Sequence, residues 1–191
     1  MGSGMPDQEQ STPVRKSPFW RFSVRFYAVP GVAQACIELQ DRAKVDVNVL
    51  FFLLWNATQN RALSHAEVAE LDRMIGEWRD ATVIPLREMR RALKSPPPVM
   101  APGAAEGFRA RIKAIELEAE RLQQEAMYDL ARSGGFGQPA ATPAEAAAIG
   151  VNSYQAVLGQ FPATPLAIVL SAFAKFEPPG RDIVDKPENL E

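Results

Sequence analysis

The chain has 191 residues, enough for one domain or one domain with an appendage, and its 47% hydrophobic and 23% charged content is ordinary for a globular protein. Its 21 basic and 23 acidic residues give a net charge of −2, so the overall charge offers no support for binding to nucleic acid. Cys36 is the only cysteine, which excludes an intrachain disulfide and means that a cysteine-based metal site would need a second chain.

The two ends of the chain, residues 1–16 and 177–191, are predicted to be disordered because both are polar or charged and rich in proline. The first residues are typical of an added start ahead of Met5, and no basic segment followed by an apolar stretch indicates a secretory signal. The longest strongly apolar run, Val47 to Trp55, is half the length that a membrane-spanning helix needs. We therefore expect a cytoplasmic protein without a membrane span.

Two helices are predicted near the N-terminus. Ser17 followed by Pro18 is typical of a helix start, because serine caps free backbone N–H groups and proline costs nothing at the first helical position. Pro30 and Gly31 end this helix. A second helix is expected from about residue 32 to residue 42, where apolar residues recur at helical spacing.

The segment from Asp46 to Trp55 is the most informative part of the chain. Asp46 can cap a helix, and eight of the nine residues from Val47 to Trp55 are apolar. A helix of this composition has no face for water and must be covered on most sides. A buried strand is the alternative for so short a run. Because no second strand is evident to pair with it, we predict a buried central helix.

Two further helices are predicted before residue 95. Ser64 and Glu67 have the spacing of a capping box, in which each side chain binds a free backbone N–H group of the other residue. Apolar residues then recur at helical spacing as far as Trp78. Pro85 is expected to kink or break the pattern just before it. The next helix ends at the proline triplet 96–98, the clearest boundary in the chain.

The C-terminal half is predicted to hold one long helix and two shorter ones. After a proline-rich linker at 96–105, apolar residues recur over 106–132 at spacings close to a heptad seam. The seam consists of Phe108, Ile112, Ile115, Ala119, Leu122 and Ala126. It must pack on the core, on the C-terminal helices or on a second chain, so a homodimer through 106–132 is one prediction. Thr142-Pro143 and Thr164-Pro165 open the two shorter helices.

Together these patterns predict an all-α protein. A compact N-terminal bundle of about five helices at 17–95 surrounds the buried central helix. A long helix and two shorter C-terminal helices follow at 106–176.

A cluster of basic residues is the best candidate for a binding site. Its members are Arg87, Arg90, Arg91 and Lys94, at helical positions i, i+3, i+4 and i+7, with Arg79 a little upstream. Guanidinium groups on one helix face could bind a phosphate, a carboxylate or an acidic partner through forked hydrogen bonds. Glu88 is the one nearby acid and is not enough to neutralise them within the helix, so we expect these guanidinium groups to lie unneutralised on the outside of the bundle. The alternative is a solvated face whose charges favour the helix C-terminus.

Other candidate sites are weaker. Trp20, Tyr27, Trp55 and Trp78 could line a ligand pocket, although aromatic residues at helical spacing are typical of plain core. His65, the only histidine, lies in the first turn of a capped helix without the partners of a catalytic triad. No catalytic residue, metal site or cofactor is predicted.

Several separated segments resemble an uncharacterised proteobacterial family, classed as a domain of unknown function. These segments include Phe19-Trp20-Arg21-Phe22, Tyr27-Ala28-Val29-Pro30-Gly31-Val32, Cys36-Ile37-Glu38-Leu39-Gln40-Asp41-Arg42, Asp46-Val47-Asn48-Val49-Leu50-Phe51 and Val83-Ile84-Pro85-Leu86-Arg87. The resemblance covers residues 17–95. It implies a bacterial cytoplasmic setting and no particular activity.

Two functions from different classes fit the sequence. The favoured one is a non-enzymatic helical module that binds a protein or an anionic partner through the basic helix face. The alternative is a small-molecule-binding protein or enzyme, with an aromatic pocket and an arginine anion site between the N-terminal helices.

Overall fold

The computed structural model describes residues 16–134 and 136–177. The predicted disorder at 1–16 and 177–191 therefore lies, except for one residue at each inner end, outside the described residues. The prediction of an all-α protein is confirmed, since helices account for most of the described chain and the one sheet is a pair of two-residue strands.

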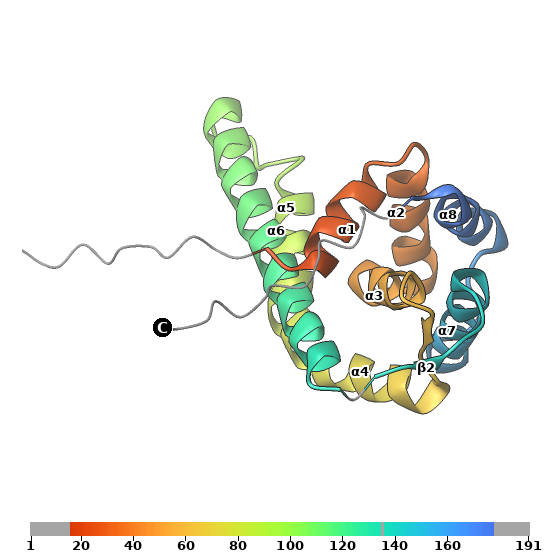
Figure 1. Cartoon of the computed structure of the whole chain (residues 1–191). Helices are drawn as coiled ribbons and strands as arrows, with labels where there is room; N and C mark the ends of the chain where they lie inside the picture. The colour runs from red at the N-terminus through yellow and green to blue at the C-terminus, as the bar shows by residue number, and fades with distance from the viewer. Residues whose placement is uncertain (1–15, 135, 178–191) are drawn as a thin grey trace, which may run out of the picture.

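The helices and strands follow one another in a simple order (Figure 1). They are α1 (Pro18–Tyr27), α2 (Val32–Ala43), α3 (Val47–Ala57), β1 (Arg61–Ala62), α4 (His65–Trp78), the π-helix η1 (Arg79–Val83), α5 (Ile84–Ala92), α6 (Pro102–Arg132), β2 (Gln138–Pro139), α7 (Pro143–Leu158) and α8 (Ala163–Lys175). None of the described helices is long and apolar enough to cross a membrane.

Helix α3 lies at the centre of the bundle, as predicted (Figure 1). Asp46 caps it by accepting a hydrogen bond from the backbone N–H of Asn48. Every residue from Val49 to Leu54 is at most 2% exposed. Phe52 makes ring contacts with Phe19, Trp55 and Phe136, which come from three parts of the chain. A segment apolar on all sides is stable here because neighbouring helices cover all of its sides.

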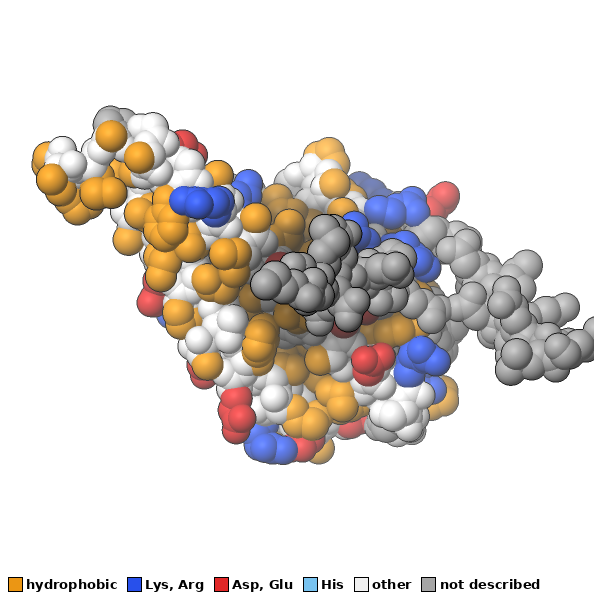
Figure 2. All heavy atoms as spheres, turned by 90° about the vertical axis from the view of Figure 1, so that its left-hand side faces the viewer, with side chains coloured by type: hydrophobic (Ala, Val, Ile, Leu, Met, Phe, Trp, Pro, Cys, Tyr) orange, Lys and Arg blue, Asp and Glu red, His pale blue; other side chains and the backbone are white. Residues whose placement is uncertain are grey.

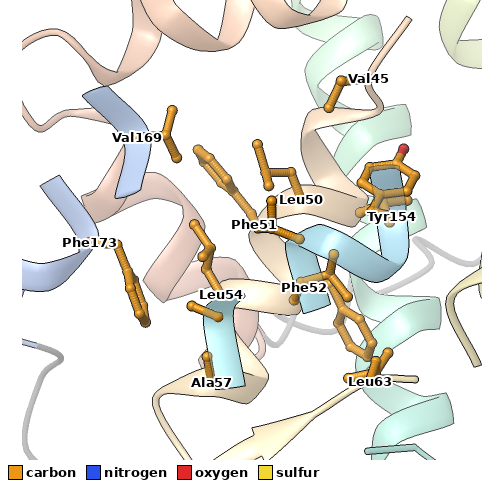
Figure 3. Close-up of a cluster of buried hydrophobic side chains, with 14 of the residues drawn as sticks. Val45, Leu50, Phe51, Phe52, Leu54, Ala57, Leu63, Tyr154, Val169 and Phe173 are labelled. Atoms are coloured by element: carbon orange, nitrogen blue, oxygen red, sulfur yellow. The ribbon is translucent and has the colours of Figure 1, made fainter. Parts of the chain in front are cut away.

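Helices α7 and α8 complete the enclosure of α3 (Figures 1 and 3). Tyr154 of α7 and Phe173 of α8 belong to the same buried cluster as the α3 side chains. Gly150 of α7 faces Leu53 of α3, since a Cβ atom there would make an ordinary van der Waals contact with Leu53 at 3.4 Å. The C-terminal helices, whose placement the sequence left open, are thus part of the one hydrophobic core.

The capping box at the start of α4 also fixes the small sheet. Glu67 accepts hydrogen bonds from the N–H and hydroxyl groups of Ser64 and from the N–H of Gly137, next to β2. Burial opposes ionisation of Glu67, but these hydrogen bonds and the charge of Arg61 lower its pKa. Arg61 pairs with Pro139 across the sheet. These strands were not predicted from the sequence, because each is two residues long.

The break expected at Pro85 takes the form of a π-helix rather than an end to the helical path. Helix α4 continues into η1, and the N–H of Ile84 binds the carbonyl of Arg79, five residues earlier. Proline lacks an N–H group and its ring crowds the preceding turn, and a wider turn accommodates both effects. Helix α6 begins at Pro102, within the linker predicted at 96–105.

Candidate functional site

The predicted basic residues of α5 face acidic residues of α6. The Nε atom of Arg87 lies 3.1 Å from Glu116 Oε1, and its Nη2 atom lies 2.7 Å from Glu120 Oε1. Arg90 binds both carboxylate oxygens of Glu116. The Glu116 side chain is 6% exposed, whereas those of Arg87 and Arg90 are 18% and 22% exposed. We call these four residues the arginine–glutamate cluster.

The expectation that these guanidinium groups lack acidic partners is therefore wrong. Spacing along α5 shows only the acids of the same helix, whereas the partners lie on α6, 26 to 33 positions further along the chain. Glu116 and Glu120 are four residues apart and so share one face of α6, which packs against α5. Whether the cluster also binds an external anion stays a prediction.

The other three basic residues are placed differently. Arg91 forms an ion pair of 2.8 Å with Asp41 of α2, and both side chains are about half exposed. Lys94 is exposed beyond the end of α5. Arg79 lies in η1, where it binds Asp72 at 2.6 Å and Asp80 at 3.2 Å and approaches Asp46 at 3.5 Å. The five predicted residues thus do not converge on one cavity.

A buried polar layer next to Arg79 was not predicted from the sequence. Gln123 donates to Asp46 at 2.7 Å, and Gln124 donates to Asn48 at 2.7 Å. The backbone N–H of Asp46 donates to the hydroxyl of Tyr154 at 3.0 Å. Because these residues come from α3, α6 and α7, the layer fixes how three helices pack together. The glutamine pair inside a heptad-like helix is the one sequence signal that could have indicated it.

Burial and neighbouring charges perturb the ionisable groups of this region. Burial, together with the charges of Glu116 and Asp46, raises the pKa of Glu120, while Arg87 opposes the shift. Burial likewise raises the pKa of Tyr27, with smaller contributions from Cys36 and Glu120. Among the described residues, no group of three or more His, Cys, Asp or Glu side chains could hold a metal ion. The arrangement is that of ion pairs between helices.

The four aromatic residues proposed to line a pocket lie in separate places. Trp20 is buried on α1, and Trp55 contacts Phe19, Phe52 and Tyr128 in the core. Tyr27 contacts Phe51 near the end of α1. Trp78 donates a hydrogen bond from Nε1 to the carbonyl of Ala119 on α6. The structure does not bring these side chains together around a common cavity.

A groove lies elsewhere on the molecule. It has a volume of about 770 Å³ and lies between the α1–α2 turn and α8. Its lining includes Val29, Pro30, Ile168, Ala172 and Phe176. None of the residues predicted to bind a ligand lines it.

Cys36 is predicted to be chemically inert in the folded protein. Its side chain is fully buried on α2, and burial raises the pKa of the thiol to about 12. At pH 8 the reactive thiolate is then about one part in ten thousand of the total. We expect iodoacetamide to leave the native protein unmodified at pH 8 and to label Cys36 rapidly in 6 M guanidinium chloride, as measured by mass spectrometry. Rapid labelling without denaturant would contradict this burial.

The predicted heptad seam of α6 is divided between the core and the surface. Ile112 and Ala119 are buried, whereas Phe108, Ile115 and Leu122 are 42%, 53% and 44% exposed. We call these three exposed residues the α6 row. Trp78 lies beside it, because its indole binds Ala119, and is itself 39% exposed. Figure 2 shows hydrophobic side chains gathered on this side of the molecule. They extend from the end that projects at the upper left of the view towards the bottom.

The fold and the site define an all-α bundle in which ion pairs fasten α5 to α6, while apolar side chains of α6 stay in contact with solvent. Residues 18–127 match the model of the family described as a protein of unknown function, DUF2390. The match covers more than half of the chain, so the chain belongs to this family, and the resemblance to an uncharacterised family is confirmed. No curated protein and no solved structure matches the chain.

Proposed function

We propose that this protein is a non-enzymatic helical module that binds another protein through the α6 row and the adjacent Trp78. The observation that carries the proposal is the row itself: three large apolar side chains, one heptad apart, remain about half exposed on the longest helix. Exposed apolar surfaces of this kind typically mark protein interfaces. We place this interaction in the bacterial cytoplasm, the setting that the family resemblance implies.

The arginine–glutamate cluster has a supporting role in this proposal. Arg87 and Arg90 use their donors on Glu116 and Glu120, so they hold α5 against one side of α6. Arg91 and Lys94 lie nearer the surface, where they could meet acidic groups at the edge of an interface. The basic face then contributes to specificity more than to affinity.

Photo-crosslinking in the native cells tests the proposal. A photoreactive amino acid is placed at position 115 or 122 of the α6 row, and at position 117 as the matched control. Leu117 is on the same helix and is 53% exposed, like Ile115, but points about 200° away from it. We expect discrete protein adducts from positions 115 and 122 and none from 117. The absence of adducts from all three positions, or identical adducts from all three, would contradict the proposal.

A further inference from the structure

We infer that the protein bound by the α6 row is a second copy of this chain, packed antiparallel across Ile115. The inference rests on the proposed function and names its partner. The α6 row is symmetric about its middle member, since Phe108 and Leu122 each lie seven residues from Ile115. A two-fold axis at Ile115 therefore places Phe108 of one copy opposite Leu122 of the other, and Ile115 opposite itself.

The charges beside the row favour this orientation. Arg111 and Glu118 are seven residues apart, so they lie on the same flank of α6, and both are exposed. Arg111 lies over the ring of Phe108, and Glu118 also binds Arg121 of its own helix at 2.6 Å, so in the dimer Glu118 would be shared between Arg121 and the Arg111 of the other copy. Arg111 lies four residues before Ile115 and Glu118 lies three after it. The two-fold axis thus brings Arg111 of each copy within reach of Glu118 of the other, which gives two symmetric ion pairs. A parallel arrangement in register would instead place like charges at the same level.

The shape of the molecule also fits an antiparallel pair. Helix α6 has 31 residues, which corresponds to a length of about 46 Å, and its N-terminal end projects beyond the rest of the bundle (Figure 1). Ile115 lies close to the middle of this helix. In an antiparallel pair each projecting end lies beside the bundle of the other copy. The two α6 helices are then in contact along their length.

Sedimentation equilibrium from about 1 µM to about 500 µM tests the inference on the full chain. The wild-type chain is expected to dimerise within this range. Ile115→Glu places two carboxylates at the two-fold axis and is expected to raise the dimer dissociation constant by at least about 30-fold. The matched control Leu117→Glu is expected to change it by less than about threefold. Circular dichroism establishes whether each variant is folded. If the Ile115→Glu variant does not fold, Leu122→Glu is used in its place.

A charge exchange tests the antiparallel orientation. Arg111→Glu is expected to weaken the dimer by about two- to tenfold, and combining it with Glu118→Arg is expected to restore the wild-type constant. A wild-type chain that stays monomeric at 500 µM, or a dimer equally sensitive to Ile115→Glu and Leu117→Glu, would overturn the inference. So would a double variant that is weaker than the single one. If the chain is monomeric and position 115 crosslinks to a different protein, the dimer is refuted but the proposed function is supported.

Discussion

Replacing Phe52 with alanine is expected to lower the free energy of unfolding by about 3–5 kcal/mol. Phe52 is 0% exposed in the middle of α3, and its ring contacts Phe19, Trp55 and Phe136. The variant loses the transfer free energy of a benzyl group and leaves a cavity that three separate segments would have to fill. Urea denaturation followed by far-ultraviolet circular dichroism measures the change.

The control for this variant is Phe108→Ala, which removes the same group from a site that is 42% exposed. We expect it to cost less than about 1 kcal/mol at concentrations where the chain is monomeric. Small domains are stable by about 5–15 kcal/mol in total, so the loss at Phe52 is large by comparison. Equal losses for the two variants would mean that α3 is not the enclosed centre of the bundle.

Replacing Arg79 with methionine is expected to destabilise the protein by about 3–5 kcal/mol. The guanidinium group binds Asp72 and Asp80 and lies 3.5 Å from Asp46. The side chains of Asp46 and Asp72 are 6% and 16% exposed, so the variant leaves two carboxylates of the interior without a cation. An unpaired buried charge costs much more than the net contribution of the intact pair.

Arg73→Met is the matched control for Arg79→Met, because Arg73 also lies within this helical segment and pairs with an acid, Glu70. Both members of this pair, Arg73 and Glu70, are exposed, and such surface pairs contribute at most about 1 kcal/mol. Thermal and urea unfolding of both variants provide the comparison. A cost below about 1 kcal/mol for Arg79→Met would show that Asp46 and Asp72 do not depend on this arginine.

The helices, and the starts of α1, α3, α4 and α7, could be predicted from the sequence because their causes are local. Helices α6 and α8 instead begin at Pro102 and Ala163 without a side-chain cap, earlier than the predicted starts at 106 and at Thr164-Pro165. Ser17 and Ser64 bind backbone N–H groups within the next three residues, and Thr142 does the same at the start of α7. The burial of α3 could also be predicted, since eight apolar residues among nine leave no face for water. Each of these conclusions depends on residues that are neighbours in the chain.

The partners of the arginines could not be predicted because they depend on how helices pack. Asp41 lies 50 positions from Arg91, and Glu116 lies 26 positions from Arg90. Helical spacing shows that Glu116 and Glu120 share a face, but it does not show which helix that face meets. For the same reason, the heptad seam could be predicted, but not which of its members are buried and which are exposed.

In the function that we propose, the basic side of α5 is bound within the chain and the apolar side of α6 is the surface for a partner. A double-mutant cycle between Arg90 and Glu116, using Arg90→Met, Glu116→Leu and the double variant, measures how strongly α5 is bound in this way. We predict a coupling free energy of about 1.5 kcal/mol or more in urea unfolding at pH 7. A coupling below about 0.3 kcal/mol would mean that Arg90 is free to bind an external anion and that the basic side of α5 is not bound within the chain.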